Sequence, residues 1–389
     1  MSSRRQRFAG LLPGIFRAAG RVAVAAGLAV GLALAGSAAF AARPDDIPTA
    51  ATQPTEARPA VRPVKPVPAA RPDARPDLKP ETKASKPGAA NDPAAAAERL
   101  KRINAARSWG YQLNGMRVDE AAKSPFDLLV ADATTGHASG RHFRRDEVEA
   151  LKKKADGGRR LVVSYLSIGE AEDYRPDYFN AEYLTEDAPD WLMHENPQWK
   201  GNRLIRFCHE GWQKTILGDE DGRSVYNSID PSPLYRLIEL GFDGIYLDRV
   251  DVYGEVAKEC PDGARKMVEF VARLAAHARK RKPDFLVILQ NAEELVRHPA
   301  MLASIDALAK EDLFYGADHS QNANSPAAVK EALGHLKAVK AANRPVFVVD
   351  YVTDATKKAD ARRRIEEQGF IPYIAPRDLG SLWLPGKDF

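Results

Sequence analysis

The stretch 241–251, with the sequence GFDGIYLDRVD, is the feature that most limits what this chain can fold into. A glycine turn leads into the short apolar run 245–247, and the run stops at Asp248. A run this short, bounded by glycine and by charge, is typical of a buried strand in a parallel sheet. An aspartate at the end of such a strand stands where α/β folds carry their functional groups, although it can also cap the loop that follows.

The same strand pattern recurs through the C-terminal part of the chain and alternates with helical patterns. One helix is expected to begin after Ser325, with Pro326 in its first position, and another to end before Pro283. Strands that alternate with helices indicate a parallel sheet, and eight of them in one domain predict an α/β fold, the closed (β/α)8 TIM barrel. The expected strands are 108–113, 126–132, 161–168, 245–248, 285–291, 307–311, 346–351 and 370–375.

A ninth strand-like run, 204–207, lies in a long aromatic segment between the third and fourth expected strands. The segment also contains Trp191, Trp199 and Trp212, and it lacks a helical period. We therefore predict that it forms an excursion that covers a cleft. The alternative makes 204–207 the fourth barrel strand and leaves 370–375 outside the barrel.

The N-terminal 41 residues have the organisation of a signal peptide. Basic residues precede an alanine-rich apolar segment, 22–35, and a small-x-small site at 39–41 is suited to cleavage. We expect a periplasmic or secreted protein with no membrane span once residues 1–41 are removed; an uncleaved anchor is the alternative. In such a compartment Cys208 and Cys260 either form a disulfide or remain two thiols, and the sequence leaves this open.

Residues 42–98 form a segment of different composition. They hold 12 of the 27 prolines and no aromatic residue, so they cannot bury enough apolar surface to offset the entropy of ordering. We expect a disordered, proline-rich and alanine-rich linker here. Residues 99–389 are then the barrel domain.

Charge and motifs exclude several classes of function. Residues 1–41 contain five arginines and no acid, so the net charge of +4 comes entirely from the leader, and the remainder, at −1, is close to neutral. A near-neutral domain has no electrostatic footprint for nucleic acid. The chain has no GxSxG elbow, no GxxxxGKS or GxxxxGKT loop and no GxGxxG turn after a strand, and we expect no cofactor. The sequence gives no indication of the oligomeric state.

Polar side chains gather at the C-terminal ends of the expected strands, whereas the strand interiors are apolar. In a barrel these ends meet at one face, so the side chains are expected to share a pocket. Carboxylates that are buried without partners are costly, which favours a functional site over a set of loop caps. The residues are Tyr111, Asp132, Tyr165, Ser167, Glu170, Asp248, Asn291, Glu311, Asp350 and Tyr351.

Several carboxylates in one cleft suit two chemistries. Glycoside hydrolysis uses one carboxylate as nucleophile or base and another as proton donor. Alternatively, acids and histidines hold a divalent metal that activates water. None of the eight histidines stands at an expected strand end, and no pair has the spacing HxxxH. Metal-dependent hydrolysis therefore ranks second, and we predict no metal ligand.

Five segments between residues 164 and 352 resemble the endo-α-1,4-polygalactosaminidase-like enzymes of glycoside hydrolase family 114, and the resemblance as a whole covers residues 108–382. A bacterial subgroup that the chain resembles more closely is also labelled as related to cysteinyl-tRNA synthetase. No HIGH-like or KMSKS-like signature supports that label here. The segments are SYLSIGEAEDYR, GFDGIYLDRVD, LQNAEEL, AKEDLFYG and FVVDYV.

The resemblance implies a (β/α)8 barrel in which Asp248 is the nucleophile and Glu311 the acid/base of a retaining reaction on α-1,4-linked galactosamine polymers. The other strand-end residues are expected to bind this polysaccharide. Trp191 and Trp199 either stack on sugar rings or pack the excursion on the barrel. Arg249 departs from the family, whose characterised enzymes tend to have Asp-Asn in this region. A barrel that binds carbohydrate at the cell envelope without cleaving it is the third alternative.

Overall fold

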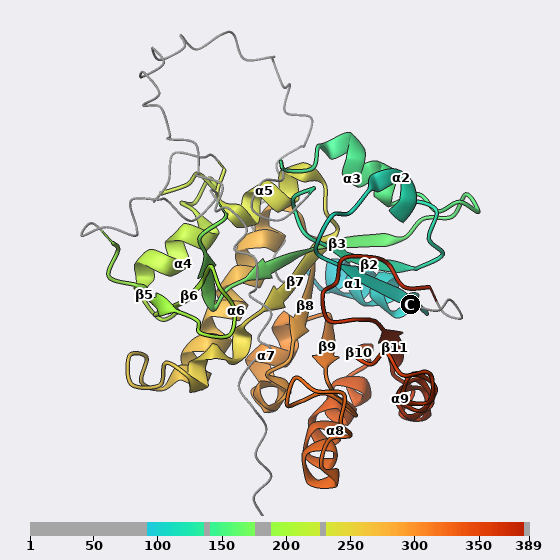
Figure 1. The fold of residues 1–389 in the computed structure, drawn as a ribbon. Helices are drawn as coiled ribbons and strands as arrows, with labels where there is room; N and C mark the ends of the chain where they lie inside the picture. Colours follow the sequence, from blue (N-terminus) through green and yellow to red (C-terminus); the bar gives the residue numbers. More distant parts are fainter. Residues whose placement is uncertain (1–91, 136–140, 176–187, 226–230, 385–389) are drawn as a thin grey trace, which may run out of the picture. The chain divides into compact units, whose positions relative to one another are not determined.

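One sheet of eight parallel strands forms the centre of the molecule (Figure 1). The computed structural model describes residues 92–135, 141–175, 188–225 and 231–384. The strands pair in the order in which they follow one another along the chain. They are β1 (Trp109–Gln112), β2 (Leu128–Ala131), β3 (Leu161–Ser167), β7 (Gly244–Asp248), β8 (Leu286–Gln290), β9 (Ala307–Glu311), β10 (Val346–Asp350) and β11 (Ile371–Ile374).

The first and last strands come together, which makes the sheet a nearly closed barrel. The indole Nε1 of Trp109 in β1 donates a hydrogen bond to the carbonyl oxygen of Ile371 in β11 at 3.0 Å. Beyond the strands, the amide of Leu113 donates to the carbonyl oxygen of Leu379 at 3.0 Å. The prediction of a (β/α)8 TIM barrel is therefore confirmed, with 370–375 as its last strand.

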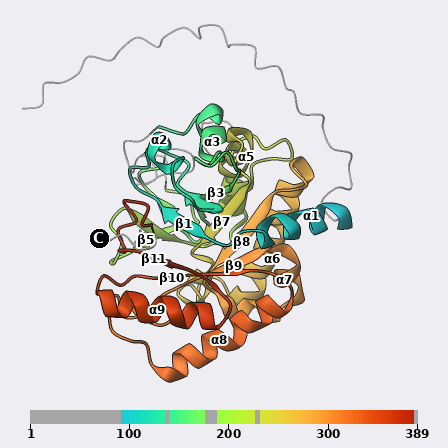
Figure 2. The ribbon, with the colours of Figure 1, turned by 90° about the vertical axis from the view of Figure 1, so that its right-hand side faces the viewer.

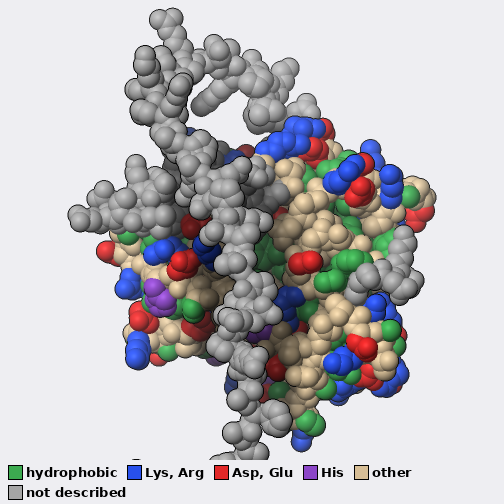
Figure 3. All heavy atoms as spheres, viewed as in Figure 1, with side chains coloured by type: hydrophobic (Ala, Val, Ile, Leu, Met, Phe, Trp, Pro, Cys, Tyr) green, Lys and Arg blue, Asp and Glu red, His purple; other side chains and the backbone are tan. Residues whose placement is uncertain are grey.

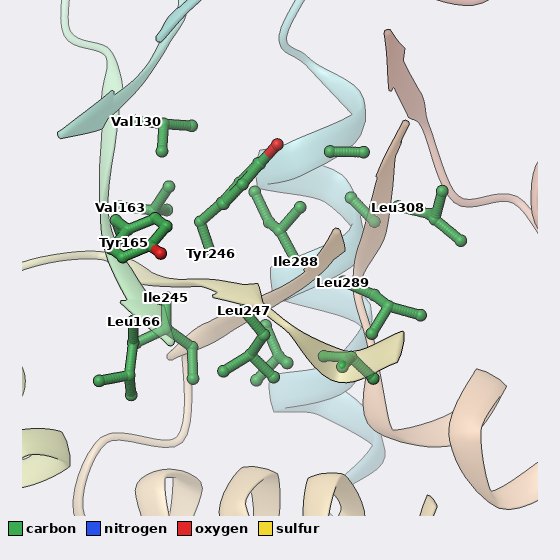
Figure 4. Close-up of a cluster of buried hydrophobic side chains, with 14 of the residues drawn as sticks. Val130, Val163, Tyr165, Leu166, Ile245, Tyr246, Leu247, Ile288, Leu289 and Leu308 are labelled. Carbon is green, nitrogen blue, oxygen red and sulfur yellow. The ribbon is translucent and has the colours of Figure 1, made fainter. Parts of the chain in front are cut away.

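The strands are apolar on both sides because both sides are covered. Tyr246, Ile288 and Leu289 on the neighbouring strands β7 and β8 have no exposed surface, and Figure 4 shows them among the buried side chains of this region. Successive residues of a strand point to opposite faces, so Leu247 and Leu289 pack toward the helices while Tyr246 and Ile288 fill the interior. This is the buried pattern that short continuous apolar runs predict.

Helices surround the strands in both ribbon views (Figures 1 and 2). Among the residues that the structure describes, no helix has the length and apolar character needed to cross a bilayer. The helices are α1 (Pro93–Asn104), α2 (Val118–Ala121), α3 (Arg145–Leu151), α4 (Glu210–Leu217), α5 (Pro233–Leu240), α6 (Gly263–Arg281), α7 (Pro299–Ser304), α8 (Pro326–Ala341) and α9 (Ala355–Glu367), with short 3-10 helices η3 (Val250–Gly254) and η4 (Glu293–Arg297).

The predicted caps of the long helices are present. The hydroxyl of Ser325 accepts a hydrogen bond from the amide of Ala328 at 3.2 Å, which begins α8, with Pro326 in its first position. Helix α6 ends at Arg281, two residues before Pro283, because proline cannot continue a helix.

The structured part begins earlier than predicted. Helix α1 starts at Pro93, capped by Asp92, inside the range that the sequence indicates as linker. Arg99 of α1 is buried and pairs with buried Asp306 at 3.0 Å, so the helix is anchored to the barrel. The alanines of 94–97 carry a weak apolar signal, which the prolines before them obscure. The predicted signal peptide and the rest of the predicted linker lie outside the described residues.

The segment between β3 and β7 forms a separate antiparallel sheet of three strands in the order β4–β6–β5. Its strands are β4 (Glu170–Glu172), β5 (Leu192–Glu195) and β6 (Asn202–Ile205). The run 204–207 therefore belongs to the excursion, as predicted: its first two residues are in β6 of the small sheet and not in the barrel. Trp191 and Trp212 are buried against each other with ring centroids 5.0 Å apart, so Trp191 packs the excursion.

Cys208 and Cys260 form a disulfide, which settles a question that the sequence leaves open. Their Cα atoms are 5.9 Å apart, and the bond joins the excursion to the chain before α6. Cys260 is fully buried.

Removing this disulfide is expected to destabilise the barrel strongly. The bond closes a loop of 52 residues, and a crosslink of that span lowers the free energy of folding by roughly 4 kcal/mol through the entropy of the unfolded chain. Changing Cys208 and Cys260 together to Ser should therefore lower the melting temperature by roughly 10 °C. A reducing agent should lower it similarly in the wild type and leave the double variant unaffected. An unchanged melting temperature would show that the bond contributes nothing.

Candidate active site

The ends of three neighbouring strands turn sharply into their loops. Arg249 follows β7 with φ 57°, Asn291 follows β8 with φ 52°, and Asp312 follows β9 with φ 51°. Non-glycine residues rarely adopt this left-handed conformation, which costs about 1–3 kcal/mol at such positions and occurs mainly at functional sites. The turns hold the last side chains of these strands, Asp248 and Glu311 among them, at the rim of the barrel.

A cavity of about 930 Å³ opens at these strand ends. Both predicted catalytic residues, Asp248 and Glu311, line it. Ser167 and Asp350 are absent from its wall. The predicted substrate-binding residues that line it are Tyr111, Asp132, Tyr165, Glu170, Asn291 and Tyr351. Residues that lie up to 240 positions apart in the chain are thus brought to one face.

Asp248 is held by two hydrogen-bond donors. The hydroxyl of Tyr165, from β3, donates to Oδ2 at 2.7 Å, and the amide of Arg249 donates to Oδ1 at 2.7 Å. The pKa of Asp248 is raised to about 7, mainly because the carboxyl is buried and also because Glu311 is negatively charged. The hydrogen bond from Tyr165 opposes both effects because it favours the ionised carboxylate.

Glu311 is held by a second set of donors. The hydroxyl of Tyr351, from the end of β10, donates to Oε1, and the side-chain amide of Asn291 donates to Oε2 at 3.3 Å. The oxygen of Asn291 in turn accepts from the backbone amide of Glu311 at 3.1 Å. Tyr351 and Asn291 therefore fix the orientation of the Glu311 carboxyl. The sequence predicted these two residues only as contacts to the substrate.

Two buried tyrosines interact with both carboxyls, and one of them, Tyr111, lines the cavity. The rings of Tyr111 and Tyr246 have centroids 5.0 Å apart, and both are almost fully buried. Burial raises the pKa of Tyr111 well above its usual value, and the charges of Tyr246, Glu311 and Asp248 add to the shift. Tyr111 therefore stays protonated and can donate a hydrogen bond into the cavity.

Asp132 and Glu170 line the cavity but already have cationic partners. Asp132 forms a two-pronged ion pair with Arg175, at 2.5 and 3.0 Å. Glu170 is buried, pairs with Arg249 at 3.0 Å, and accepts hydrogen bonds from the side chains of two asparagines of the excursion. Both acids thus organise the cavity wall.

Ser167 and Asp350, predicted to bind substrate, contact the backbone of loops instead. The hydroxyl of Ser167 accepts a hydrogen bond from the amide of Glu170 at 3.2 Å and is buried. Asp350 is fully buried, and Oδ1 accepts from the amide of Leu313 at 2.7 Å. Asp350 and Tyr351 are adjacent, so their side chains face opposite ways and only Tyr351 reaches the cavity.

Asp350 gives a stability prediction with a defined pH dependence. Burial raises its pKa to about 7, above the ordinary value of about 3.9. Its stabilising contribution is therefore complete below about pH 4 and decreases as the pH rises through 7. Asp350→Asn keeps one acceptor for Leu313 and should lower the free energy of unfolding most at low pH. Denaturant unfolding should show the deficit shrinking by at most roughly 1.4 kcal/mol per pH unit. A deficit that grows from pH 5 to pH 8 would contradict this environment.

Several residues of the cavity wall were not predicted as site residues. Glu172 and Asp251 are two of them, and they pair with Arg175 and Arg249. Arg175 gave no signal in the sequence as a residue of the site, because its other partner, Asp132, follows a different strand. Other additional wall residues include Gln290, His319 and Arg377, and Trp199, one of the two tryptophans for which stacking on sugar rings was left open, also lines the cavity.

The cavity carries an excess of acid. Ten acidic and five basic side chains line it, whereas the face drawn in Figure 3 shows acidic and basic side chains interspersed where it is not covered. Within the described ranges, no group of three or more His, Cys, Asp or Glu side chains has an arrangement that could hold a metal ion. The wall thus offers paired carboxyls, protonated tyrosines and a negative potential.

Comparison with known proteins gives consistent matches over the barrel. The profile of glycoside-hydrolase family GH114 matches residues 89–386. The uncharacterised protein MJ1477 of Methanocaldococcus jannaschii is 33% identical over 295 residues, 71% of this chain and 79% of that protein. An uncharacterised protein of Thermotoga maritima is 32% identical over 285 residues, 70% of this chain and 81% of that protein.

Among solved structures, the glycoside hydrolase domain of PelA from Pseudomonas aeruginosa has a similar fold. It superimposes with a TM-score of 0.53 at 18% sequence identity, covering 71% of this chain and 97% of that domain. A variant of the same domain gives a TM-score of 0.52.

Proposed function

Because the chain belongs to glycoside-hydrolase family GH114, we propose that it cleaves an amino-sugar polysaccharide of the α-1,4-galactosamine type, with Asp248 as nucleophile and Glu311 as acid/base. The proposal depends on one observation above all. The two carboxyls, from strands β7 and β9, line one cavity, and the charge of Glu311 acts on Asp248. Two carboxyls that flank one bond are what glycoside hydrolysis requires.

The proposed reaction has two steps. In the first, an oxygen of Asp248 attacks the anomeric carbon while Glu311 donates its proton to the glycosidic oxygen. The bond to the leaving sugar breaks, and a glycosyl ester of Asp248 forms. In the second step Glu311 takes a proton from a water whose oxygen attacks the same carbon, and Asp248 leaves as a carboxylate. The anomeric configuration is retained.

The neighbours of Asp248 suit its role as nucleophile. Tyr165 and the amide of Arg249 donate to Asp248, which favours the ionised nucleophile. Since the pKa of Asp248 is raised to about 7, the ionised form prevails in the free protein only above that pH. A cationic sugar in the cavity would lower that pKa and so favour the nucleophilic form.

The charge of the cavity supports a cationic substrate. Ten acids face five bases across its wall, so the local potential favours sugars that carry free amino groups. A polymer of deacetylated galactosamine fits this requirement, and a neutral polysaccharide would gain nothing from it.

We also propose that the protein works outside the cytoplasm, in the periplasm or as a secreted enzyme. The disulfide between Cys208 and Cys260 supports an oxidising compartment. The leader 1–41 supports export. Fractionation of cells that express the full chain, followed by N-terminal sequencing of the mature protein, tests both points.

The function is tested by incubating the purified protein with partially deacetylated α-1,4-galactosamine polymers and measuring new reducing ends. Release of oligosaccharides by the wild type is the expected result. Activity abolished by a chelator and restored by a divalent ion would instead favour metal-dependent hydrolysis. Binding of the polymer with no release of reducing ends would favour a carbohydrate-binding barrel.

A further inference from the structure

Trp199 stands out among the large apolar side chains of the described residues. It is 48% exposed, whereas Trp191 and Trp212, in the same excursion, are buried. Trp199 also lines the cavity that contains Asp248 and Glu311. A single exposed apolar residue is ordinary on a protein surface, so its exposure alone would mean little. Its position at the cavity and the rigidity of its support require an explanation.

Trp199 lies at the tip of the hairpin between β5 and β6, and the backbone there is tightly fixed. The amide of Trp199 donates to the carbonyl oxygen of Asn196 at 3.2 Å, and the amide of Asn202 donates to that of Trp199 at 3.0 Å. The amide of Gly201 donates to Glu195 at 2.7 Å. Gly201 has φ 90°, a conformation that glycine adopts without strain.

A buried network connects this tip to the nucleophile. Glu170 accepts from the side-chain amides of Asn196 and Asn202 at 2.7 and 2.8 Å, which clamps both sides of the hairpin tip. The same carboxylate pairs with Arg249 at 3.0 Å, and Arg249 directly follows Asp248. The hairpin that carries Trp199 is therefore fixed relative to the end of β7.

We propose that Trp199 forms a sugar-binding subsite remote from the cleaved bond, where its indole stacks on a ring of the polymer; this inference rests on the proposed function. The apolar face of a sugar ring matches an exposed indole that is already held in place, since little conformational freedom is lost on binding. A cavity of about 930 Å³ is near the upper end of ordinary ligand sites, of roughly 300–1,000 Å³, and accommodates more than one sugar unit.

The proposed subsite also gives a role to Arg249, the position at which this chain departs from the family pattern. Its guanidinium pairs with Glu170, Glu255 and Asp251, at 3.0, 2.6 and 3.6 Å. It joins the strand that carries the nucleophile to the hairpin that carries the indole. Stacking at Trp199 would therefore set the register of the polymer relative to Asp248.

The test compares a long substrate with a short one in matched variants. Trp199→Ala should lower kcat/KM on the polymer by roughly 5–20-fold, mainly through KM, and leave kcat/KM on an aryl α-galactosaminide within about twofold, since that substrate does not reach the tip. Trp199→Phe should recover part of the loss. Val225→Ala is the control, because Val225 is 42% exposed and absent from the cavity wall. It should match the wild type on both substrates.

Two outcomes would overturn the subsite. One is an unchanged kcat/KM of Trp199→Ala on the polymer. The other is an equal loss on both substrates, which would indicate a structural role for the indole. If the wild type cleaves neither substrate, the proposed function fails, and the subsite is then decided by binding alone. An α-1,4-galactosamine hexasaccharide should change the tryptophan fluorescence of the wild type and not that of Trp199→Phe. No change in the wild type rejects the subsite.

Discussion

Replacing Asp248 by Asn is expected to lower kcat on the amino-sugar polymer by about 10⁴-fold or more, because the side chain that attacks the sugar is lost. Asparagine has the same size, and its one side-chain oxygen can still accept the hydrogen bond from the amide of Arg249. Its NH2 group then stands where Oδ2 accepted from Tyr165, whose hydroxyl can turn to accept instead. The fold should therefore persist. The melting temperature should equal that of the wild type or exceed it, since the partly buried carboxyl with its raised pKa is removed.

Asp251→Asn is the matched control for this variant. Asp251 lies three residues further along the chain, lines the same cavity and undergoes the same chemical change. It pairs with Arg249 at 3.6 Å and has no assigned contact with the reacting bond. Its kcat should fall by less than about 10-fold, the range of a weakened exposed ion pair. Comparable losses in the two variants would mean that general charge in the cavity, and not a nucleophile, is responsible.

Glu311→Gln is expected to lower kcat/KM on the galactosamine polymer by about 10²–10⁴-fold, the usual contribution of a general acid. The phenolate of an activated aryl galactosaminide can leave without a proton, so the first step of its cleavage should be nearly unaffected. Rapid-mixing kinetics should then show a burst of released phenol followed by slow turnover, because the second step still needs Glu311 as base. Loss of the burst, with equal damage to both substrates, would remove Glu311 from the role of acid/base.

The same variant should move the pH dependence in a defined direction. The negative charge of Glu311 contributes to raising the pKa of Asp248 to about 7. Neutral glutamine removes that contribution, so the ionised nucleophile should form at lower pH. The rising limb of kcat/KM for the aryl substrate should lie near pH 7 in the wild type and shift to lower pH in Glu311→Gln. An unchanged limb, or a shift to higher pH, would show that the two carboxyls are not coupled.

The barrel was predictable because its strands are short, buried and regularly spaced. Runs such as 346–349 are apolar throughout because both faces of a parallel sheet are covered. The cap at Ser325 and the proline at position 283 mark a helix start and a helix end. The antiparallel sheet of the excursion was less visible. Strand β5 is four residues long and largely exposed, so it lacks the apolar alternation that indicates a strand.

The site was predictable to the extent that it follows from strand ends. Asp248 and Glu311 end β7 and β9 and reach the same cavity, because parallel strands deliver their C-terminal residues to one face. Asp350 shows the limit of this reasoning: whether the last or the next residue of a strand faces the cavity depends on register, which the sequence does not reveal. The pairing of Arg175 with Asp132 depends on tertiary structure, and nothing in the local pattern indicates it.

The most direct test of the proposed mechanism is to locate the covalent bond between the sugar and Asp248 that the first step requires. Glu311→Gln, in which the second step is slow, would be incubated with 5-fluoro-α-galactosaminyl fluoride, digested with a protease and mapped by mass spectrometry. One added sugar is expected on the peptide that contains Asp248, and on no other. A sugar attached to a different residue, or consumption of the reagent by the protein with no adduct at all, would contradict it.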